Sequence, residues 1–453
     1  MFRLHHPSTR GDTTGTEYVS DEVITTILYD PASPHAQHPV STPVDNRQDT
    51  ADERRSYRRR TVVAALGVGA VTGCLRAGTQ ADGSPTGAPT ETGDTTGTPS
   101  ETATPTGPVS LSQAWGSFFE PDGDPLLADG TLYMGSASGV RAIATSDGTE
   151  RWRSNGERVR FAGSLDDDGL YYTTPLENGL TRLARGSGEV LASIDFGPTG
   201  ARPAVAGDHV VVGTDHNAGT DAPPNTLAGF SKTDLSQSWS VSEPDVKYTD
   251  GLGYDGRAIV GFGESPYAQI QARDPATGAV DWSLDGYIAA PLQIHEGALY
   301  APLAANGVEL VRIDPASGDV VWRHTLEQRG ESSFVFSAAP ALHEGRAYLA
   351  AYRQVHAIDL ETGETDWTAT TDQLVDVRPA VVGDYLWVVP RATPEQEQDG
   401  QRNRQLLGFD RESGELQVQL QLTASTRQPF AFGSRLGVLM DDRLAAFDVE
   451  ATG

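Results

Sequence analysis

A repeated pattern of Asp, Gly and Trp constrains this chain more than any other feature of its sequence. In the clearest copy Asp314 is followed four positions later by Gly318, and Trp322 follows after four more. The same spacing recurs at Asp274, Gly278 and Trp282, and again at Asp359, Gly363 and Trp367. Each copy predicts a β-strand, a tight turn and a second strand. Self-similarity of this kind, with a period of roughly 20–50 residues, is typical of solenoids and propellers.

The spacing of the copies predicts how many units there are. The position eight before the Trp recurs at intervals of about 40–50 residues, and it is occupied by Ala144, Ala184, Ser231, Asp274, Asp314, Asp359, Asp410 and Asp448. The fifth unit contains four predicted strands, over residues 287–294, 297–303, 308–313 and 319–326. Four short strands joined by Gly-bearing turns form a meander, which is the sheet of one propeller blade. We therefore predict an all-β fold over residues 110–453, a single eight-bladed β-propeller, or seven blades if the second or eighth unit is degenerate.

The two ends of the repeat region predict how the ring closes. The last copy stops shortly after Asp448, where the turn into a fourth strand belongs. A blade without its outer strand would expose an open sheet edge. Residues 112–118 precede the first copy and contain Trp115 at the place expected for a fourth strand. We expect this N-terminal strand to complete the eighth blade.

The motif residues have structural explanations. Glycine permits the tight turn between the third and fourth strands, and the Asp and Ser/Thr side chains can hydrogen-bond the turn amides. A Trp on the outer strand can bury roughly 150–250 Å² against the next blade. We therefore interpret the aligned Asp residues as structural and not catalytic. The expected docking residues are Trp115, Trp152, Trp239, Trp282, Trp322, Trp367, Gly278, Gly318 and Gly363.

These copies closely resemble the tryptophan-docking repeats of the PQQ-like, or quinoprotein-type, β-propellers, over residues 111–453. The resemblance implies a propeller that either binds a quinone or acts as a scaffold, as one lipoprotein of bacterial outer-membrane assembly does. The single cysteine excludes the adjacent cysteine pair of the alcohol-oxidising members and the CxxCH haem motif. No match to the Ca²⁺ ligands of those enzymes can be placed on the chain. We expect no cofactor and no metal, with PQQ and Ca²⁺ as the less favoured alternative.

The residues before the repeats predict export. Residues 1–53 are polar, and residues 54–74 combine a basic cluster, a short apolar stretch and small residues, as an export signal does. Arg59 and Arg60 resemble a twin-arginine signal, and Cys74 follows a lipobox-like sequence. Residues 75–109 are rich in Thr, Gly, Pro and Ser, which is typical of a flexible tether. We expect a protein lipidated at Cys74 and anchored to the outer face of the cell membrane.

The charge limits the partners. The formal net charge is −28, and Lys232 and Lys247 are the only lysines. Such a surface repels nucleic-acid phosphate, so nucleic acid is not an expected partner. It suits a halophilic, haloarchaeal source, because salt screens the self-repulsion, although an ordinary acidic surface that favours solubility explains it too. We expect a monomer.

Candidate binding residues lie where the repeats become irregular. Two long insertions, residues 214–225 and 390–404, fall in the third and seventh units, on one face and on opposite sides of a central funnel. They are candidate contacts for a protein or small ligand, or tolerated surface insertions. Inner strands begin near a recurring proline, at Pro125, Pro203, Pro291, Pro340 and Pro379. Two of these prolines follow an arginine that could meet a carboxylate in the funnel, unless each arginine pairs with a nearby acid. The candidate funnel residues are Arg202, Arg378, Tyr248, Tyr287, Phe334 and His216.

No catalytic motif emerges. Asp166, Asp167 and Asp168 lack EF-hand spacing and are interpreted as a solvated acidic turn, and the histidines lack metal-ligand spacing. The sequence therefore favours a membrane-anchored, extracytoplasmic binding or protein-scaffolding propeller that is not an enzyme. The alternative is a quinone-dependent dehydrogenase or a sugar-binding enzyme that uses the funnel.

Overall fold

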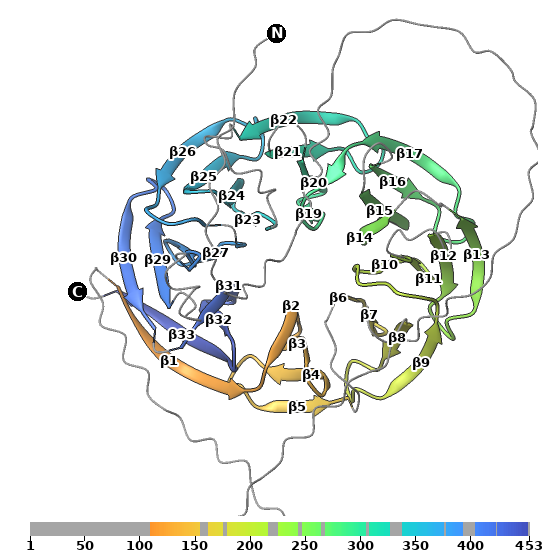
Figure 1. Ribbon diagram of the computed structural model, residues 1–453, viewed down its shortest axis with the longest axis horizontal. Coiled ribbons are helices and arrows are strands. Elements are labelled where there is room, and N and C mark those ends of the chain that lie inside the picture. The colour runs from red at the N-terminus through yellow and green to blue at the C-terminus, as the bar shows by residue number, and fades with distance from the viewer. Residues whose placement is uncertain are drawn as a thin grey trace, which may run out of the picture. The chain divides into compact units, whose positions relative to one another are not determined.

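A computed structural model describes residues 109–154, 162–174, 179–215, 225–242, 247–263, 268–304, 308–326, 338–375, 377–392, 404–422 and 424–451. In these ranges all regular secondary structure is β-strand, from β1 to β33, and no helix is long and apolar enough to cross a bilayer. The strands form eight separate antiparallel sheets arranged around a common axis (Figure 1). The predicted eight-bladed β-propeller is confirmed, and the seven-bladed alternative is not needed.

The first four blades are meanders of four strands in chain order. Blade one contains β2 (Pro121–Ala128), β3 (Thr131–Ser136), β4 (Gly139–Ala144) and β5 (Glu150–Arg153). Blade two contains β6 (Ala162–Leu165), β7 (Leu170–Thr174), β8 (Gly179–Leu183) and β9 (Val190–Asp195). Blade three contains β10 (Ala204–Ala206), β11 (His209–Gly213), β12 (Thr226–Ser231) and β13 (Gln237–Ser242). Blade four contains β14 (Lys247–Tyr254), β15 (Arg257–Gly263), β16 (Gln269–Arg273) and β17 (Val280–Asp285).

The remaining blades follow the same plan. Blade five has its inner strand split into β18 (Tyr287–Ile288) and β19 (Gln293–His295), followed by β20 (Ala298–Ala304), β21 (Val308–Ile313) and β22 (Val320–Leu326). Blade six contains β23 (Ala341–His343), β24 (Arg346–Ala351), β25 (Gln354–Asp359) and β26 (Thr365–Thr370). Blade seven contains β27 (Ala380–Val382), β28 (Tyr385–Val388), β29 (Gln405–Asp410) and β30 (Leu416–Gln421). Blade eight contains β31 (Thr426–Phe432), β32 (Arg435–Met440), β33 (Arg443–Ala451) and β1 (Val109–Phe118).

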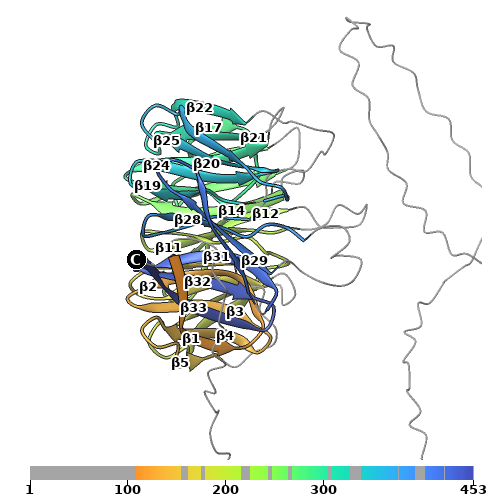
Figure 2. The same cartoon turned by 90° about the vertical axis from the view of Figure 1, so that its left-hand side faces the viewer.

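Blade eight joins the two ends of the repeat region. Strand β1 pairs antiparallel with β33, from Val109 opposite Ala451 to Phe118 opposite Arg443. The side view shows β1 lying beside β33 (Figure 2). The N-terminal strand therefore completes the last blade, as the repeat phase predicts, and the outer edge of β33 is covered.

Each docking tryptophan lies against the turn of the following blade. The Trp282 indole N–H donates to the carbonyl oxygen of Pro315 at 3.0 Å, and its ring lies under Gly318. Gly318 has φ +80°, and a Cβ there would lie 2.6 Å from the indole, so a larger residue would be both strained and blocked. The same arrangement joins Trp115 to Gly148, Trp152 to Gly188, Trp239 to Gly278, Trp322 to Gly363 and Trp367 to Gly414.

The aspartates of the motif hold these turns. The Asp274 carboxylate accepts hydrogen bonds from the amides of Ala276 and Thr277 and from the Thr277 hydroxyl. These bonds lower the pKa of Asp274, because they favour its charged form. Asp359 and Asp410 make equivalent bonds to their own turns. These carboxylates are engaged within their own turns, and Asp448 pairs instead with Arg435 at 2.8 Å.

The contact between blades two and three uses a different pair of residues, and blade seven also lacks the Trp, with Val418 in its place. In blade two the Trp position holds Ala192, and in blade three the Gly position holds Leu235, which adopts φ +56°. Leu235 is 2% exposed and belongs to the apolar cluster on which Ala192 packs. The Leu235 side chain thus occupies the space that the indole of a Trp fills at the contacts described above. A left-handed leucine costs about 1–2 kcal/mol, and its burial offsets this.

The exchange can be tested with a double-mutant cycle. Ala192→Trp should lower stability by about 1–3 kcal/mol through overpacking, and Leu235→Gly should lower it by about 2 kcal/mol or more by leaving a cavity. The double variant rebuilds the Trp–Gly contact and should recover most of both losses. Urea unfolding of the four proteins measures the coupling. Additive losses would contradict this account of the contact.

Candidate functional site

The inner strands of the propeller border a central channel. A proline occurs in most of them, which is tolerated because an inner strand is a sheet edge and needs no ladder partner on its channel side. Counting back five residues from the first turn residue of each inner hairpin aligns one position, which directly precedes the proline in blades one, three, seven and eight. This position holds Asp124 in blade one, Arg202 in blade three, Asp250 in blade four, Arg378 in blade seven and Gln428 in blade eight.

Three of these residues follow a break in the strand register. The pairing shifts between Asp122 and Leu126 in β2, between Tyr248 and Asp250 in β14, and between Thr426 and Gln428 in β31. β-Bulges redirect side chains and are enriched beside functional sites. Asp124 lies within the unpaired stretch of β2, and Asp250 and Gln428 are the first paired residues after the shift in their strands.

Arg202 is engaged in an ion pair. Its Nη2 lies 2.8 Å from Asp250 Oδ2, and its Nε donates to Oδ1 at 3.1 Å. Nη2 also donates to the carbonyl of Leu292, whose own amide donates to Asp250 Oδ2 at 2.7 Å. Burial raises the pKa of Asp250, while the Arg202 guanidinium and the Leu292 amide oppose that shift. Of the two alternatives for Arg202, a free ligand-binding group or one partner of an ion pair, the structure shows the ion pair.

Arg378 differs from Arg202. Its Nη2 donates to the side-chain oxygen of Gln293 at 3.1 Å, and the side chain stays exposed to solvent within the channel. The surrounding blades crowd the guanidinium and lower its pKa, Asp124 raises it, and the charge of Arg202 lowers it further. Arg378 nevertheless stays charged, since arginine is protonated throughout the normal pH range. Of the two candidate arginines, Arg378 is therefore the one that a ligand in the channel can reach.

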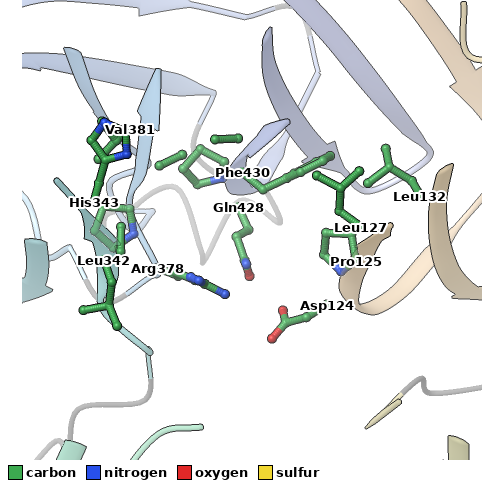
Figure 3. Close-up of a pocket in the computed structure, with 15 residues that line it drawn as sticks. Asp124, Pro125, Leu127, Leu132, Leu342, His343, Arg378, Val381, Gln428 and Phe430 are labelled. Carbon is green, nitrogen blue, oxygen red and sulfur yellow. The ribbon is translucent and has the colours of Figure 1, made fainter. Parts of the chain in front are cut away.

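A cavity of about 270 Å³ lies beside Arg378, between inner strands β2, β23, β27 and β31. Figure 3 shows the Arg378, Gln428 and Asp124 side chains pointing toward one another into this space. Apolar side chains form other parts of its wall, among them Leu127, Leu342 and Phe430. We call this space the axial cavity. It combines a cation, an anion and a carboxamide with an apolar surface.

The other candidate funnel residues do not join this cavity. Tyr248 is 3% exposed, and its hydroxyl donates to the carbonyl of Arg202 at 2.7 Å, so its placement at the funnel mouth is wrong. Tyr287 is 37% exposed and lies on β18 of blade five, beside Gly263 of blade four. Phe334 and His216 lie outside the described residues.

The described ends of both insertions lie on one face. The Asp215 amide donates to the carbonyl of Pro198 at 2.7 Å, and the Arg391 amide donates to that of Leu374, also at 2.7 Å. Pro198 and Leu374 belong to the connections that lead into β10 and β27. Each insertion therefore starts against the segment that carries Arg202 or Arg378. Residues 216–224 and 393–403 lie outside the described part of the chain.

Asp124, Gln428 and Gln293 were not predicted from the sequence. The signal that could have found Asp124 and Gln428 is their position directly before an inner-strand proline, the same signal that pointed to Arg202 and Arg378. Gln293 carries no such mark, because it follows its blade's proline by two positions.

The triple aspartate forms an ion pair and not a cation loop. Lys232 Nζ from blade three lies 2.6 Å from Asp166 and 3.4 Å from Asp168. Asp166 also accepts from the amides of Asp168 and Gly169, as a turn residue does. Within the described ranges no group of three or more His, Cys, Asp or Glu side chains is arranged to hold a metal ion. Arg59, Arg60 and Cys74 lie before the described residues.

A family model described as PQQ_2, outer membrane protein assembly factor BamB, matches residues 136–291 and 306–450. A search of curated protein sequences found no match. Among solved structures, BamB from Moraxella catarrhalis is similar with a TM-score of 0.57 and 17% identity, covering 75% of this chain and 97% of that one.

Two further structures are similar to a comparable degree. The computationally designed Ika8 protein has a TM-score of 0.54 and 13% identity, covering 74% of this chain and 98% of its own. Quinohemoprotein alcohol dehydrogenase from Comamonas testosteroni has a TM-score of 0.52 and 13% identity, covering 74% and 76%. At these identities the likeness shows the fold alone.

The Trp-docked ring of eight blades defines a PQQ-like β-propeller. Because the family model matches more than half of the sequence, the chain belongs to the PQQ_2 family, described as outer membrane protein assembly factor BamB. Among the described residues, the carboxylates at the aligned inner-strand position are Asp124 and Asp250, and Asp250 is held by Arg202.

Proposed function

We propose that this chain is an extracytoplasmic, membrane-anchored scaffold that binds a protein partner through the face carrying the insertions 214–225 and 390–404. The observation that supports it most is the pairing of the two insertions with a rigid ring. Their described ends start on one face, at blades three and seven. Long loops on a rigid scaffold are common sites of recognition.

The rigidity follows from the repeated blade contacts. Each Trp–Gly contact buries an indole against the next turn, and the closing strand β1 supplies the contact between blades eight and one. A scaffold of this kind loses little conformational entropy on binding, since its backbone is already ordered. The family description, outer membrane protein assembly factor, is consistent with a role in protein assembly.

The location is part of the proposal. The export signal over residues 54–74, with Arg59, Arg60 and lipidation at Cys74, would place the propeller outside the membrane on the tether of residues 75–109. A lipid anchor at the start of this tether would keep the propeller within the tether's reach of the membrane surface. The strongly acidic, lysine-poor composition would keep such a protein soluble in concentrated salt.

Site-specific photocrosslinking in intact cells tests the scaffold function. Lysine-directed reagents suit this protein poorly, because Lys232 and Lys247 are both held in ion pairs. A photoreactive amino acid at Arg391 should instead capture a defined protein neighbour. The matched control at Asp384, in the opposite-face turn of the same blade, should not. No adduct at either position, or the same adducts at both, would contradict the proposal.

The quinone alternative has its own readout. A ligand of the native state raises the unfolding free energy by about 2.7 kcal/mol at a hundred times its dissociation constant. Under the scaffold proposal, PQQ with Ca²⁺ should leave the melting temperature of the full chain unchanged. A saturable increase would favour the dehydrogenase reading.

A further inference from the structure

The axial cavity is lined by charged and polar side chains, which would not be needed if side chains only had to fill the centre of the ring. Arg378 and Asp124 face the same space from blades seven and one, with Gln428 of blade eight between them (Figure 3). The two charged groups do not form an ion pair with each other, although they interact at longer range. Among the described residues, the Asp124 carboxylate and the Gln428 carboxamide have no hydrogen-bond partner.

The opposite side of the channel shows what a satisfied arrangement looks like. There Arg202 and Asp250, from adjacent blades, meet directly and complete their hydrogen bonds with Leu292. In blades seven, eight and one the corresponding cation and anion are separated by a whole blade. At equivalent strand positions the channel thus contains one cation and anion in direct contact, Arg202 with Asp250, and one cation and anion that do not touch, Arg378 with Asp124. We call these the closed pair and the open pair.

The walls and the volume of the axial cavity restrict the kind of ligand that can bind there. Leu127, Leu342 and Phe430 present apolar surface to the cavity, and Leu127 is 47% exposed. Its volume of about 270 Å³ lies just below the roughly 300–1,000 Å³ of pockets that hold drug-sized ligands. A ligand that fits must therefore be small, with one anionic end, one cationic end and an apolar part.

We propose that the axial cavity binds a free α-amino acid with an aliphatic side chain. Its carboxylate accepts hydrogen bonds from the Arg378 guanidinium, and its ammonium group donates to the Asp124 carboxylate. The Gln428 carboxamide lies between the two and can donate to one end and accept from the other. The aliphatic side chain packs on Leu127 and Phe430.

Physical arguments support both charged contacts. A guanidinium binds a carboxylate through charge-assisted hydrogen bonds, which are among the strongest in proteins. The ligand's two charges each meet an opposite charge, whereas a ligand with a single charge would leave either Arg378 or Asp124 without a partner of opposite sign. A tricarboxylate such as PQQ would place excess negative charge beside Asp124 and is disfavoured. Binding of L-leucine and crosslinking of a protein partner are measured separately, so either proposal can fail without the other.

The test is isothermal titration calorimetry of the whole chain with three probes of similar shape. L-leucine carries both charges, 4-methylpentanoate carries the carboxylate alone, and 3-methylbutylamine carries the ammonium group alone. L-leucine should bind tightest. Arg378→Gln or Asp124→Asn should each weaken its binding roughly tenfold or more, as expected for loss of a hydrogen bond to a charged group.

The two single-charge probes make the test specific. Asp124→Asn should strengthen binding of 4-methylpentanoate, because it removes a like charge, and Arg378→Gln should strengthen binding of 3-methylbutylamine for the same reason. Arg323→Gln and Asp255→Asn, at exposed surface positions, are matched controls and should change neither affinity. Absence of L-leucine binding to the wild-type chain, or equal loss in the control variants, would overturn the proposal.

Discussion

Deletion of residues 111–118 should prevent the propeller from forming a stable closed ring. These residues contain most of β1, whose Trp115 and Leu111 are 5% and 7% exposed. The Trp115 indole N–H donates to Thr145 of blade one at 3.0 Å, and the Ser117 hydroxyl donates to Gly148 at 2.6 Å. Loss of a buried Trp alone costs about 3–5 kcal/mol, against a total stability of about 5–15 kcal/mol for a typical domain.

The comparison needs a deletion of equal length. Deleting residues 91–98, from the Thr- and Pro-rich segment, should leave the melting temperature unchanged, whereas deleting residues 111–118 should abolish the cooperative transition or yield aggregates through the exposed edge of β33. Circular dichroism and size-exclusion chromatography measure both. A synthetic peptide of residues 109–118 added in trans should restore the transition, and the same peptide with Trp115→Ala should restore less. Equal stability of the two deletion variants would refute closure by β1.

Replacing Asp250 by alanine should be the most damaging point change in the channel. The carboxylate is buried, pairs with Arg202 through two hydrogen bonds and accepts the Leu292 amide. Its removal leaves a partly buried guanidinium and a buried amide without their acceptor. Breaking a buried pair costs about 3–5 kcal/mol, and because Arg202 retains 27% side-chain exposure we expect the lower end of that range. Thermal unfolding should show the midpoint falling by about 5 °C.

Two further variants show that the loss comes from the broken pair. Replacing both partners, as Arg202→Met with Asp250→Leu, removes the unpaired charge and should recover part of the stability. Arg378→Met changes an arginine at the equivalent position that is exposed and makes a single hydrogen bond to Gln293, so it should have little effect. If Arg378→Met destabilised the protein as much as Asp250→Ala, the distinction between a closed and an open side of the channel would be wrong.

The fold was predictable because it depends on spacing along the chain. Gly318, Trp322 and their counterparts recur at one interval, and each turn needs a left-handed residue directly above an indole. The blade count and the role of Trp115 follow from that phase. The contact between Ala192 and Leu235 could be predicted only in part. The repeat spacing shows that blade two lacks its Trp. It does not show that Leu235 fills the space, because a leucine with a left-handed backbone is unfavourable at that position.

The candidate site was predicted less completely. Arg202 and Arg378 share the same local signal, an arginine before an inner-strand proline, yet one is closed in an ion pair and the other is open to the axial cavity. Tyr248 enters an inner strand as expected but is buried beneath the Arg202 backbone. In each case the environment of the side chain depends on which residue of another blade lies close to it. The sequence of its own blade does not contain that information.

The all-β fold, the eight blades and the closing strand are therefore properties that the order of residues already contains. They arise from local turns and from one contact repeated between neighbours. The division of the channel into a paired and an unpaired side arises from the ring as a whole. Ring closure brings together side chains from blades far apart in sequence, and bulges in β2, β14 and β31 lie where Asp124, Asp250 and Gln428 enter the channel. Short-range pattern cannot specify such contacts, because each depends on the positions of several blades at once.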